Sequence, residues 1–302
     1  MKLSVVLGSY NRKDFLKETI YSIRKELLNC NFKSEIIIVD GGSQDGTLKW
    51  LIKQKDIITV VQHNRGTWQG KKIEKKTWGY FMNLGFKIAQ GKYLLMISDD
   101  CLIVPNAINN GVKLFEEKLK QKEKIGGIAF YWRNWPEDKY YFVGKTLGDK
   151  MVINHGLYLT KALKEVDYLD EKIINFYYGD GDLSLKILNA GYKIIDCPTS
   201  FIEHCYHLNL KLRKGNEQTE KNDWQNYISK WNKTFYKNKF KGSWQKIVFE
   251  DRAKTYRNFF KAFTIKNYFI YFILILRKYL KNHHYPLYQK MEKFNPYKTS
   301  LK

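Results

Sequence analysis

Four short apolar runs, each followed directly by polar residues, constrain the fold of this chain more than any other feature of its sequence. The runs are rich in the β-branched residues that favour strands, and amphipathic stretches with helical spacing separate them. This alternation is typical of a doubly wound α/β fold with a mostly parallel sheet. The runs comprise residues 3–7, 35–39, 57–61 and 93–97.

The rest of the chain divides into a less regular part and a basic tail. Further strands of a mixed sheet are expected at 126–131, 139–143 and 193–195, and a helix is expected to begin near Asp180. Beyond about residue 211, lysine and aromatic residues dominate with helical patterning. We therefore interpret residues 1–210 as one α/β domain, with halves 1–100 and 101–210, and residues 211–302 as a helical, basic C-terminal extension.

The charge of the chain requires an acidic partner or environment. Its formal net charge is +23, which suits nucleic acid, an anionic membrane surface or a phosphate-rich substrate. The four cysteines show no Cys-x-x-Cys spacing, and a chain this long does not need disulfides. The first apolar run is too short for a signal peptide, and no segment reaches the roughly 20 apolar residues that span a bilayer. We expect a cytoplasmic protein, or one attached peripherally to a membrane from that side.

Polar clusters follow three of the predicted strands. They should meet at one edge of the sheet, beyond the carboxyl ends of the strands. This is the edge at which open α/β sheets bind their ligands. Carboxylates gathered there suit a hard divalent cation that bridges to a diphosphate. The alternative is that Asp40 and Asp45 only form turns and cap the next helix. The clusters are Ser9-Tyr10-Asn11-Arg12, residues 40–47 and Ser98-Asp99-Asp100.

These clusters, in this order and spacing, resemble the family 2 glycosyltransferases. The resemblance rests on residues 4–12 and 38–47, on Asn83-Leu84-Gly85, on residues 89–93 and on Asp99-Asp100, and it covers roughly residues 3–210. It implies the GT-A fold, a Rossmann-like mixed sheet, with the nucleotide sugar held by the first hundred residues and the acceptor by residues 101–210.

The resemblance also implies a set of donor contacts. It implicates Tyr10 and Asp40 in binding the nucleoside of the donor, with Tyr10 stacking on the base and Asp40 accepting a hydrogen bond from a pyrimidine ring nitrogen. Asp99 is expected to support the ribose or the waters of the metal. The full set of expected donor-binding residues is Ser9, Tyr10, Asn11, Arg12, Asp40, Asn83 and Asp99.

The metal motif of the family falls on Ser98-Asp99-Asp100. Ser98 replaces its first aspartate, so Asp100 is the expected ligand of Mn²⁺ or Mg²⁺. Some family members add a histidine, and His204 is a better match for it than His207. A surface or packing role for these histidines is the alternative.

A general base must remove the proton of the acceptor hydroxyl. Asp180 and Asp182 fall where the family carries a Glu-Asp-x-Asp-Leu motif, with Gly179 in the position of the glutamate. Two carboxylates two residues apart at a helix start cannot share a face. Asp180 is therefore the expected catalytic base, and Asp182 is expected to cap the helix.

The function that follows is inverting transfer from a nucleoside-diphosphate sugar, with a uridine-linked donor expected, to a hydroxyl of a glycan or lipid-linked acceptor, as in polysaccharide biosynthesis. One alternative is a catalytically silent relative that only binds. Another is a basic protein that binds nucleic acid or membrane, which explains the tail but not the ordered acidic clusters. No nucleic-acid partner is therefore expected.

An apolar run in the tail has two possible partners. Residues 268–276 are all apolar and are followed by Arg277 and Lys278. Such a helix can lie in an acidic membrane interface through residues 264–281, or it can dock on its own catalytic domain. The basic character of the tail favours the membrane.

Overall fold

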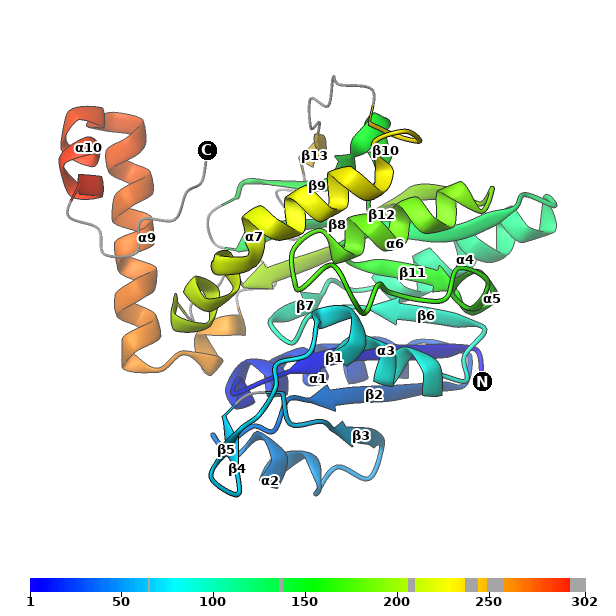
Figure 1. Ribbon diagram of the computed structural model, residues 1–302, viewed down its shortest axis with the longest axis horizontal. Coiled ribbons are helices and arrows are strands. Elements are labelled where there is room, and N and C mark those ends of the chain that lie inside the picture. The colour runs from blue at the N-terminus through cyan, green and yellow to red at the C-terminus, as the bar shows by residue number, and fades with distance from the viewer. Residues whose placement is uncertain (65, 136–137, 206–209, 237–243, 249–257, 294–302) are drawn as a thin grey trace.

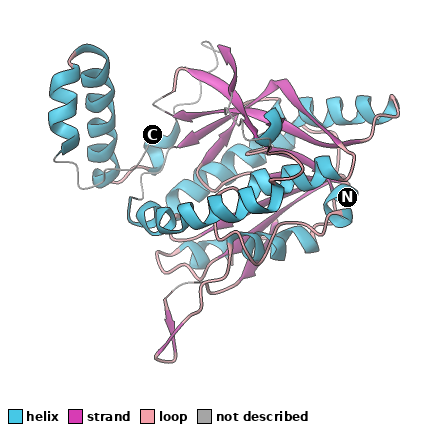
Figure 2. Ribbon diagram, turned by 45° about the horizontal axis from the view of Figure 1, so that its top comes forward, coloured by secondary structure: helices cyan, strands magenta, loops and turns pink. Residues whose placement is uncertain are grey.

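The computed structural model describes the chain except for residues 65, 136–137, 206–209, 237–243, 249–257 and 294–302. One large mixed sheet runs through the molecule, and helices cover both of its faces (Figures 1 and 2). Its strands follow the order β10-β9-β8-β11-β6-β1-β2-β3. The expected doubly wound α/β fold is confirmed.

The strands and helices have the following bounds. The strands are β1 (Leu3–Ser9), β2 (Ser34–Asp40), β3 (Ile57–Val61), β4 (Thr67–Trp68), β5 (Lys71–Lys72), β6 (Tyr93–Met96), β7 (Cys101–Ile103), β8 (Ile125–Trp135), β9 (Tyr140–Thr146), β10 (Lys150–Met151), β11 (Gly156–Leu159), β12 (Lys193–Cys205) and β13 (Trp244–Val248). The helices are α1 (Lys13–Leu28), α2 (Thr47–Leu51), α3 (Trp78–Ile88), α4 (Ala107–Lys120), α5 (Thr160–Glu165), α6 (Gly179–Asn189), α7 (Leu210–Trp231), α9 (Ile265–His283) and α10 (Tyr285–Lys293), with 3-10 turns η1 (Leu147–Asp149) and η2 (Asn258–Ala262).

The first half of the chain forms the parallel part of the sheet. β1 pairs in parallel with both β2 and β6, and β2 pairs in parallel with β3. The apolar side chains of β1, β2 and β6 are almost fully buried because helices pack on both faces, whereas Ile58 and Val61 of the edge strand β3 are exposed. The parallel pairing brings the ends of β1 and β2 into register at Ser9 and Asp40, so the polar residues that follow them share one edge.

The second half completes the sheet with antiparallel strands. β11 lies between β6 and β8 and pairs antiparallel with both. β12 is much longer than the predicted strand 193–195, because it continues past an irregularity between Cys197 and Phe201 to pair with the end of β8 and with β7. This extension carries His204 to the edge where β7 begins.

The start of the predicted extension belongs to the body of the molecule. Tyr227 and Trp231 of α7 pack with Leu185 of α6 in a buried cluster, and β13 pairs with β9 in the main sheet. These described parts of the extension therefore pack on the α/β domain. The reason is that the aromatic residues of α7 complete the cover over α6.

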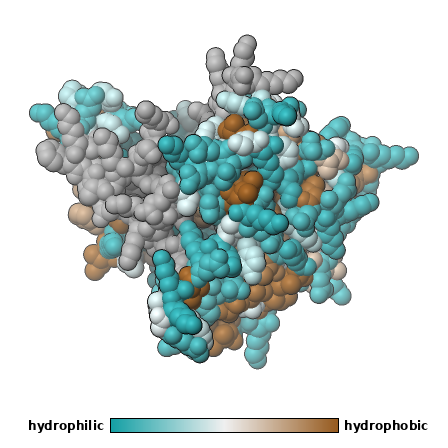
Figure 3. All heavy atoms as spheres, in the orientation of Figure 1, coloured by the Kyte–Doolittle hydropathy of each residue, from teal (hydrophilic) through white to brown (hydrophobic). Residues whose placement is uncertain are grey.

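The last helices stand at one end of the molecule. α9 and α10 project from the side toward which the arrows of β2 and β12 point (Figure 1). The root of α9 nonetheless packs on the body, since Ile270 and Phe259 share a buried cluster with Leu102, Trp135 and Cys205. Within the described residues, no helix combines the length and apolarity required to cross a bilayer. Polar residues cover most of the face in Figure 3, and apolar side chains reach the surface over α9 at its left.

Candidate active site

A buried ion cluster lies at the carboxyl edge of the sheet. The guanidinium of Arg12, at the start of α1, donates from Nη1 to Oδ1 of Asp99 at 3.1 Å and to Oδ2 of Asp100. Burial raises the pKa of Asp99 to about 6 although Arg12 opposes the shift. Burial alone would lower the pKa of Arg12, but the two carboxylates raise it, so its charge is permanent. The cluster joins the loop after β1 to the loop after β6.

The loop after β2 is held by Asp40. This side chain is fully buried, and it accepts hydrogen bonds from the backbone N–H of Gly42 and Ser43 and from the hydroxyl of Ser43. The ring of Tyr10 lies against Gly41, where an added Cβ would approach it to 3.1 Å. Oδ2 of Asp40 accepts only one of these hydrogen bonds and can accept another. Because the side chain is fully buried, a contact with a nucleobase requires the surrounding loops to move.

The loops after β1 and β2 are tied together. The backbone N–H of Asn11 donates to the hydroxyl oxygen of Ser43 at 2.8 Å, and the side-chain oxygen of Asn11 accepts from the N–H of Gln44. Asp45 accepts from the N–H of Lys13 and from Thr47 at the start of α2. The turn-forming alternative thus describes Asp45 correctly. Ser9 is buried at the end of β1, beside these loops.

Asp100 and His204 come together as the sequence predicts for a metal site. Nε2 of His204 lies 3.4 Å from Oδ1 of Asp100, while Arg12 occupies the other oxygen of Asp100. Two adjacent ligands of an octahedral ion with bonds of about 2.1 Å lie about 3 Å apart, so this pair fits a divalent cation. The thiol of Cys101 belongs to the same group, all of whose candidate ligand atoms lie within 4.8 Å of one another.

Three residues beside Asp100 and His204 were not predicted from the sequence. They are Cys101, Trp132 and His155. Nε2 of His155 lies 3.8 Å from the sulfur of Cys101, and the ring of His155 is 5.6 Å from that of His204. Burial lowers the pKa of His155 to about 3, so the ring is neutral. Trp132 touches both rings edge-on. Their positions in three different strands or loops gave no local motif. His207, the other histidine considered, lies outside the described residues.

Asp180 is connected to this group through the next residues. Its Oδ2 accepts from the amide nitrogen of Asn154 at 2.5 Å, and Oδ1 accepts from the N–H of Gly181. The amide oxygen of Asn154 accepts in turn from the indole of Trp132. Burial raises the pKa of Asp180. Two hydrogen bonds, through Asn154, thus link the predicted base to the indole of Trp132. This indole contacts the rings of His155 and His204.

Two predicted roles require correction. Asp182 does not cap α6, because its carboxylate is buried and accepts from the indole of Trp231 and from the ammonium of Lys230 on α7. It is a structural anchor and is not placed to act on an acceptor. Asn83 is also buried, and its amide is used by the backbone of Leu169 and the carboxylate of Glu171. We assign Asn83 to holding that loop rather than to the donor.

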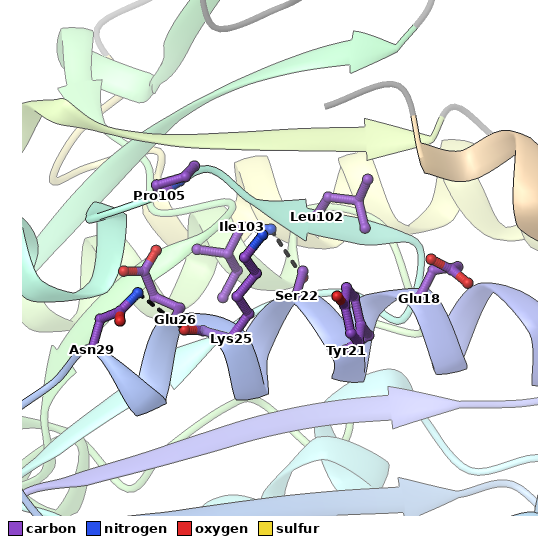
Figure 4. A pocket seen from close by; sticks show the side chains of 9 residues that line it. All are labelled: Glu18, Tyr21, Ser22, Lys25, Glu26, Asn29, Leu102, Ile103 and Pro105. Atoms are coloured by element: carbon purple, nitrogen blue, oxygen red, sulfur yellow. Dashed lines mark hydrogen bonds between the residues drawn. The ribbon is translucent and has the colours of Figure 1, made fainter. Parts of the chain in front are cut away.

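A shallow pocket lies behind this edge, between α1 and β7. Tyr21, Lys25 and Glu26 line it from the helix, and Leu102 and Ile103 line it from the strand (Figure 4). None of the predicted site residues lines this pocket. It is therefore separate from the ion cluster, although the side chains of β7 reach both.

Several known proteins with similar sequences are named glycosyltransferases. WfaP of Escherichia coli, named a UDP-Glc:alpha-D-GlcNAc-diphosphoundecaprenol beta-1,3-glucosyltransferase, is 30% identical over 227 residues, which are 72% of this chain and 82% of WfaP. The uncharacterized glycosyltransferase YfnE of Bacillus subtilis is 26% identical over 60% of this chain. The chain spans about half the length of YfnE and of the Mycoplasma genitalium glycosyltransferase MG060, 48% and 43% respectively.

Solved structures share the fold at low identity. The mannosyltransferase PcManGT from Pyrobaculum calidifontis, solved with GDP-Man and Mn²⁺, gives a TM-score of 0.53 at 15% identity over 80% of this chain and 66% of its own. S. aureus TarS 1–349 gives 0.51 at 15% identity over 78% and 74%. The model of the family described as Glycosyl transferase family 2 matches residues 4–156. This match covers half of the chain and includes the Arg12–Asp99–Asp100 cluster. The chain is a member of glycosyl transferase family 2.

Proposed function

We propose that the chain is an inverting glycosyltransferase that moves a sugar from a nucleoside-diphosphate donor to a hydroxyl of a glycan or lipid-linked acceptor. The observation that carries this proposal is the buried cluster of Arg12, Asp99 and Asp100, with His204 3.4 Å from Asp100, at the carboxyl edge of the sheet. A site with one fixed guanidinium and room for a divalent ion suits the negative charge of a diphosphate.

The relatives support the donor and acceptor classes. The name of WfaP gives a UDP-glucose donor and a sugar on diphosphoundecaprenol as acceptor. By analogy we propose a UDP-sugar donor for this chain and an acceptor carried on a lipid diphosphate. Tyr10 remains the proposed platform for the nucleobase, because its ring lies against Gly41 in the loop after β2.

Asp100 and His204 are the residues that would hold Mn²⁺ or Mg²⁺. When bound, the ion supplies positive charge to the leaving diphosphate. Arg12 forms ion pairs with Asp99 and Asp100 and fixes their side chains in place, so that the loop after β6 is pre-organised before the donor arrives. Cys101 is fully buried and burial raises its pKa, so it stays a neutral thiol in the absence of metal.

Asp180 is the proposed general base. The acceptor oxygen attacks the anomeric carbon as the carbon–oxygen bond to the diphosphate breaks, and the bonding pair leaves with the diphosphate. The hydroxyl proton passes to the carboxylate of Asp180. The hydrogen bond from Asn154 fixes the orientation of that carboxylate, and the raised pKa makes it a better proton acceptor. Because the acceptor attacks the anomeric carbon from the side opposite to the leaving diphosphate, this single displacement inverts the configuration of that carbon.

A second candidate function has a specific observation in its favour. Ser98 and Gly179 stand where the family carries carboxylates, and a relative that binds a nucleotide sugar without transferring it would tolerate both changes.

A peripheral position at the cytoplasmic face of a membrane is the location that a lipid-linked acceptor favours for either candidate.

A donor screen tests the proposal. Nucleotide release is measured with a panel of sugar nucleotides, with Mn²⁺ or Mg²⁺, and with undecaprenyl-diphosphate sugars as acceptors. We expect metal-dependent release of UDP from one donor that requires the acceptor. Binding of the donor with no release under any combination would instead support the silent relative.

A further inference from the structure

Helix α9 carries an apolar stripe that the body of the molecule does not cover. Its members recur at spacings of three and four residues, which places them on one face of the helix. Ile265 is 91% exposed, Phe269 65% and Phe272 63%. So large a row of exposed apolar side chains marks an interaction surface. The stripe comprises Ile265, Phe269, Phe272, Ile275, Leu276 and Tyr279.

The stripe is not needed to hold the helix in place. Ile270 is buried with Phe259 in the cluster formed with β7, β8 and β12, and the ring of Tyr271 stacks on Trp135 with centroids 5.7 Å apart. Tyr268 is a further anchor, because its ring stacks on Phe260 and its hydroxyl donates to the carbonyl of Phe260. None of these anchors belongs to the stripe. The helix is therefore fixed by one side while the stripe faces outward.

The charge on α9 selects the partner. Residues 265–283 contain no aspartate or glutamate, and the helix carries Lys266, Lys278 and Lys281 exposed together with Arg277. A second copy of the chain placed on the stripe would bring two sets of four basic residues together, and like charges repel. An anionic lipid surface neutralises these charges and accepts the aromatic side chains at its interface.

We propose that α9 lies in the interface of a bilayer that contains acidic lipid, with the stripe inserted among the headgroups. The root of the helix packs on Leu102 and Cys205, which are the neighbours in sequence of Cys101 and His204. Membrane binding through α9 therefore holds the carboxyl edge of the sheet close to the lipid surface. This position would bring a lipid-linked acceptor to the site, and this consequence alone rests on the proposed function.

Substitutions on the stripe test the inference better than truncation. Removing the chain from residue 264 would also take away Ile270 and Tyr271 from the buried cluster, so loss of binding could reflect loss of folding. The test variant is Phe269→Ser with Phe272→Ser. The control is Ile52→Ser, because Ile52 is 76% exposed on the body, far from α9 in the sequence. Both variants should keep the melting temperature of the wild type.

The measurement is co-sedimentation with vesicles of phosphatidylcholine alone or mixed with phosphatidylglycerol. We expect the wild type and Ile52→Ser to bind the acidic vesicles, and the double variant to bind at least tenfold more weakly. Raising the salt from 0.05 to about 0.5 M should weaken binding, because it screens the lysines. Equal binding by the double variant, or no binding by the wild type at low salt, would overturn the inference.

Two further readouts separate the possible failures. Sedimentation of the free protein shows whether the stripe joins two copies: a dimer that the double variant abolishes would assign the stripe to a second copy instead. The shift in melting temperature caused by UDP with Mn²⁺ should be the same in the double variant and the wild type. Nucleotide release without vesicle binding would refute the membrane inference alone, and vesicle binding without any donor binding would refute the proposed function alone.

Discussion

At the residue scale, the candidate site is defined by how buried charges are paired. Asp100 lies between a permanent cation, Arg12, and a histidine, while Asp182, only two positions from the proposed base, is paired with Lys230. The sequence assigned Asp180 as the base and Asp182 as a helix cap, but it could not predict the ion pair of Asp182 with Lys230, which lies 48 residues further along the chain. The distinction comes from α7, which approaches one carboxylate and leaves the other to Asn154.

The two aspartates should respond differently to the loss of charge. Asp180→Asn should leave binding of the donor near normal and slow transfer by roughly two to four orders of magnitude, the usual contribution of a general base. Asp182→Asn should chiefly destabilise the fold, since it removes the charge that pairs with Lys230 and leaves that ammonium with Asp170 alone, at a cost of about 1 to 3 kcal/mol. Kinetics and urea unfolding of both variants check this. Unchanged transfer in Asp180→Asn would exclude it as the base.

His155 should make stability depend on pH. Its folded pKa of about 3 lies below the ordinary value of 6.5, so the unfolded chain binds a proton that the folded chain does not. Stability should therefore fall as pH drops below about 6.5, by up to about 1.4 kcal/mol per pH unit from this group. Urea unfolding between pH 7 and 4.5 in EDTA measures the slope. His155→Gln should reduce that slope by the contribution of one proton, up to about 1.4 kcal/mol per pH unit. An unchanged slope would contradict this role of His155.

At the scale of elements, the strands and helices of the first half follow from apolar periodicity. Leu16, Ile20 and Ile23 are fully buried as the helical spacing predicts, and residues 57–61 form β3 with the predicted bounds. The later elements were harder to predict because their partners lie far away in the sequence. β7 has only three residues, and the extension of β12 depends on its pairing with β7 and β8.

Helix α7 should hold in place the loop of residues 175–177, which leads to Asp180. Asp223 is fully buried and accepts hydrogen bonds from the backbone N–H groups of Asn175, Phe176 and Tyr177. Asp223→Ala leaves these donors without their acceptor and should cost on the order of 3 kcal/mol of unfolding free energy. Asp223→Asn keeps one acceptor oxygen and should cost less. Equal stability of the alanine variant and the wild type in urea would show that α7 does not hold the loop.

At the scale of the whole molecule, one edge of the sheet gathers the ion cluster, the proposed base and the root of α9. The sequence predicted that the polar clusters would meet there, because parallel strands place their carboxyl ends together. It did not predict that residues after 211 would pack on the same body, since the lysine-rich composition of α7 hides the few aromatic residues that are buried. The expected helical character of the tail is confirmed in α7, α9 and α10.

The central claim is that Asp100 joins a metal and a nucleoside diphosphate in one site, and thermal unfolding with UDP and Mn²⁺ tests it most directly. Both ligands bind only the folded state, so together they should raise the melting temperature of the wild type by roughly 5 °C and by more than the sum of their separate effects. Asp100→Ala should abolish this synergy while a remote control, Ile52→Ser, retains it. Full synergy in Asp100→Ala would contradict the account.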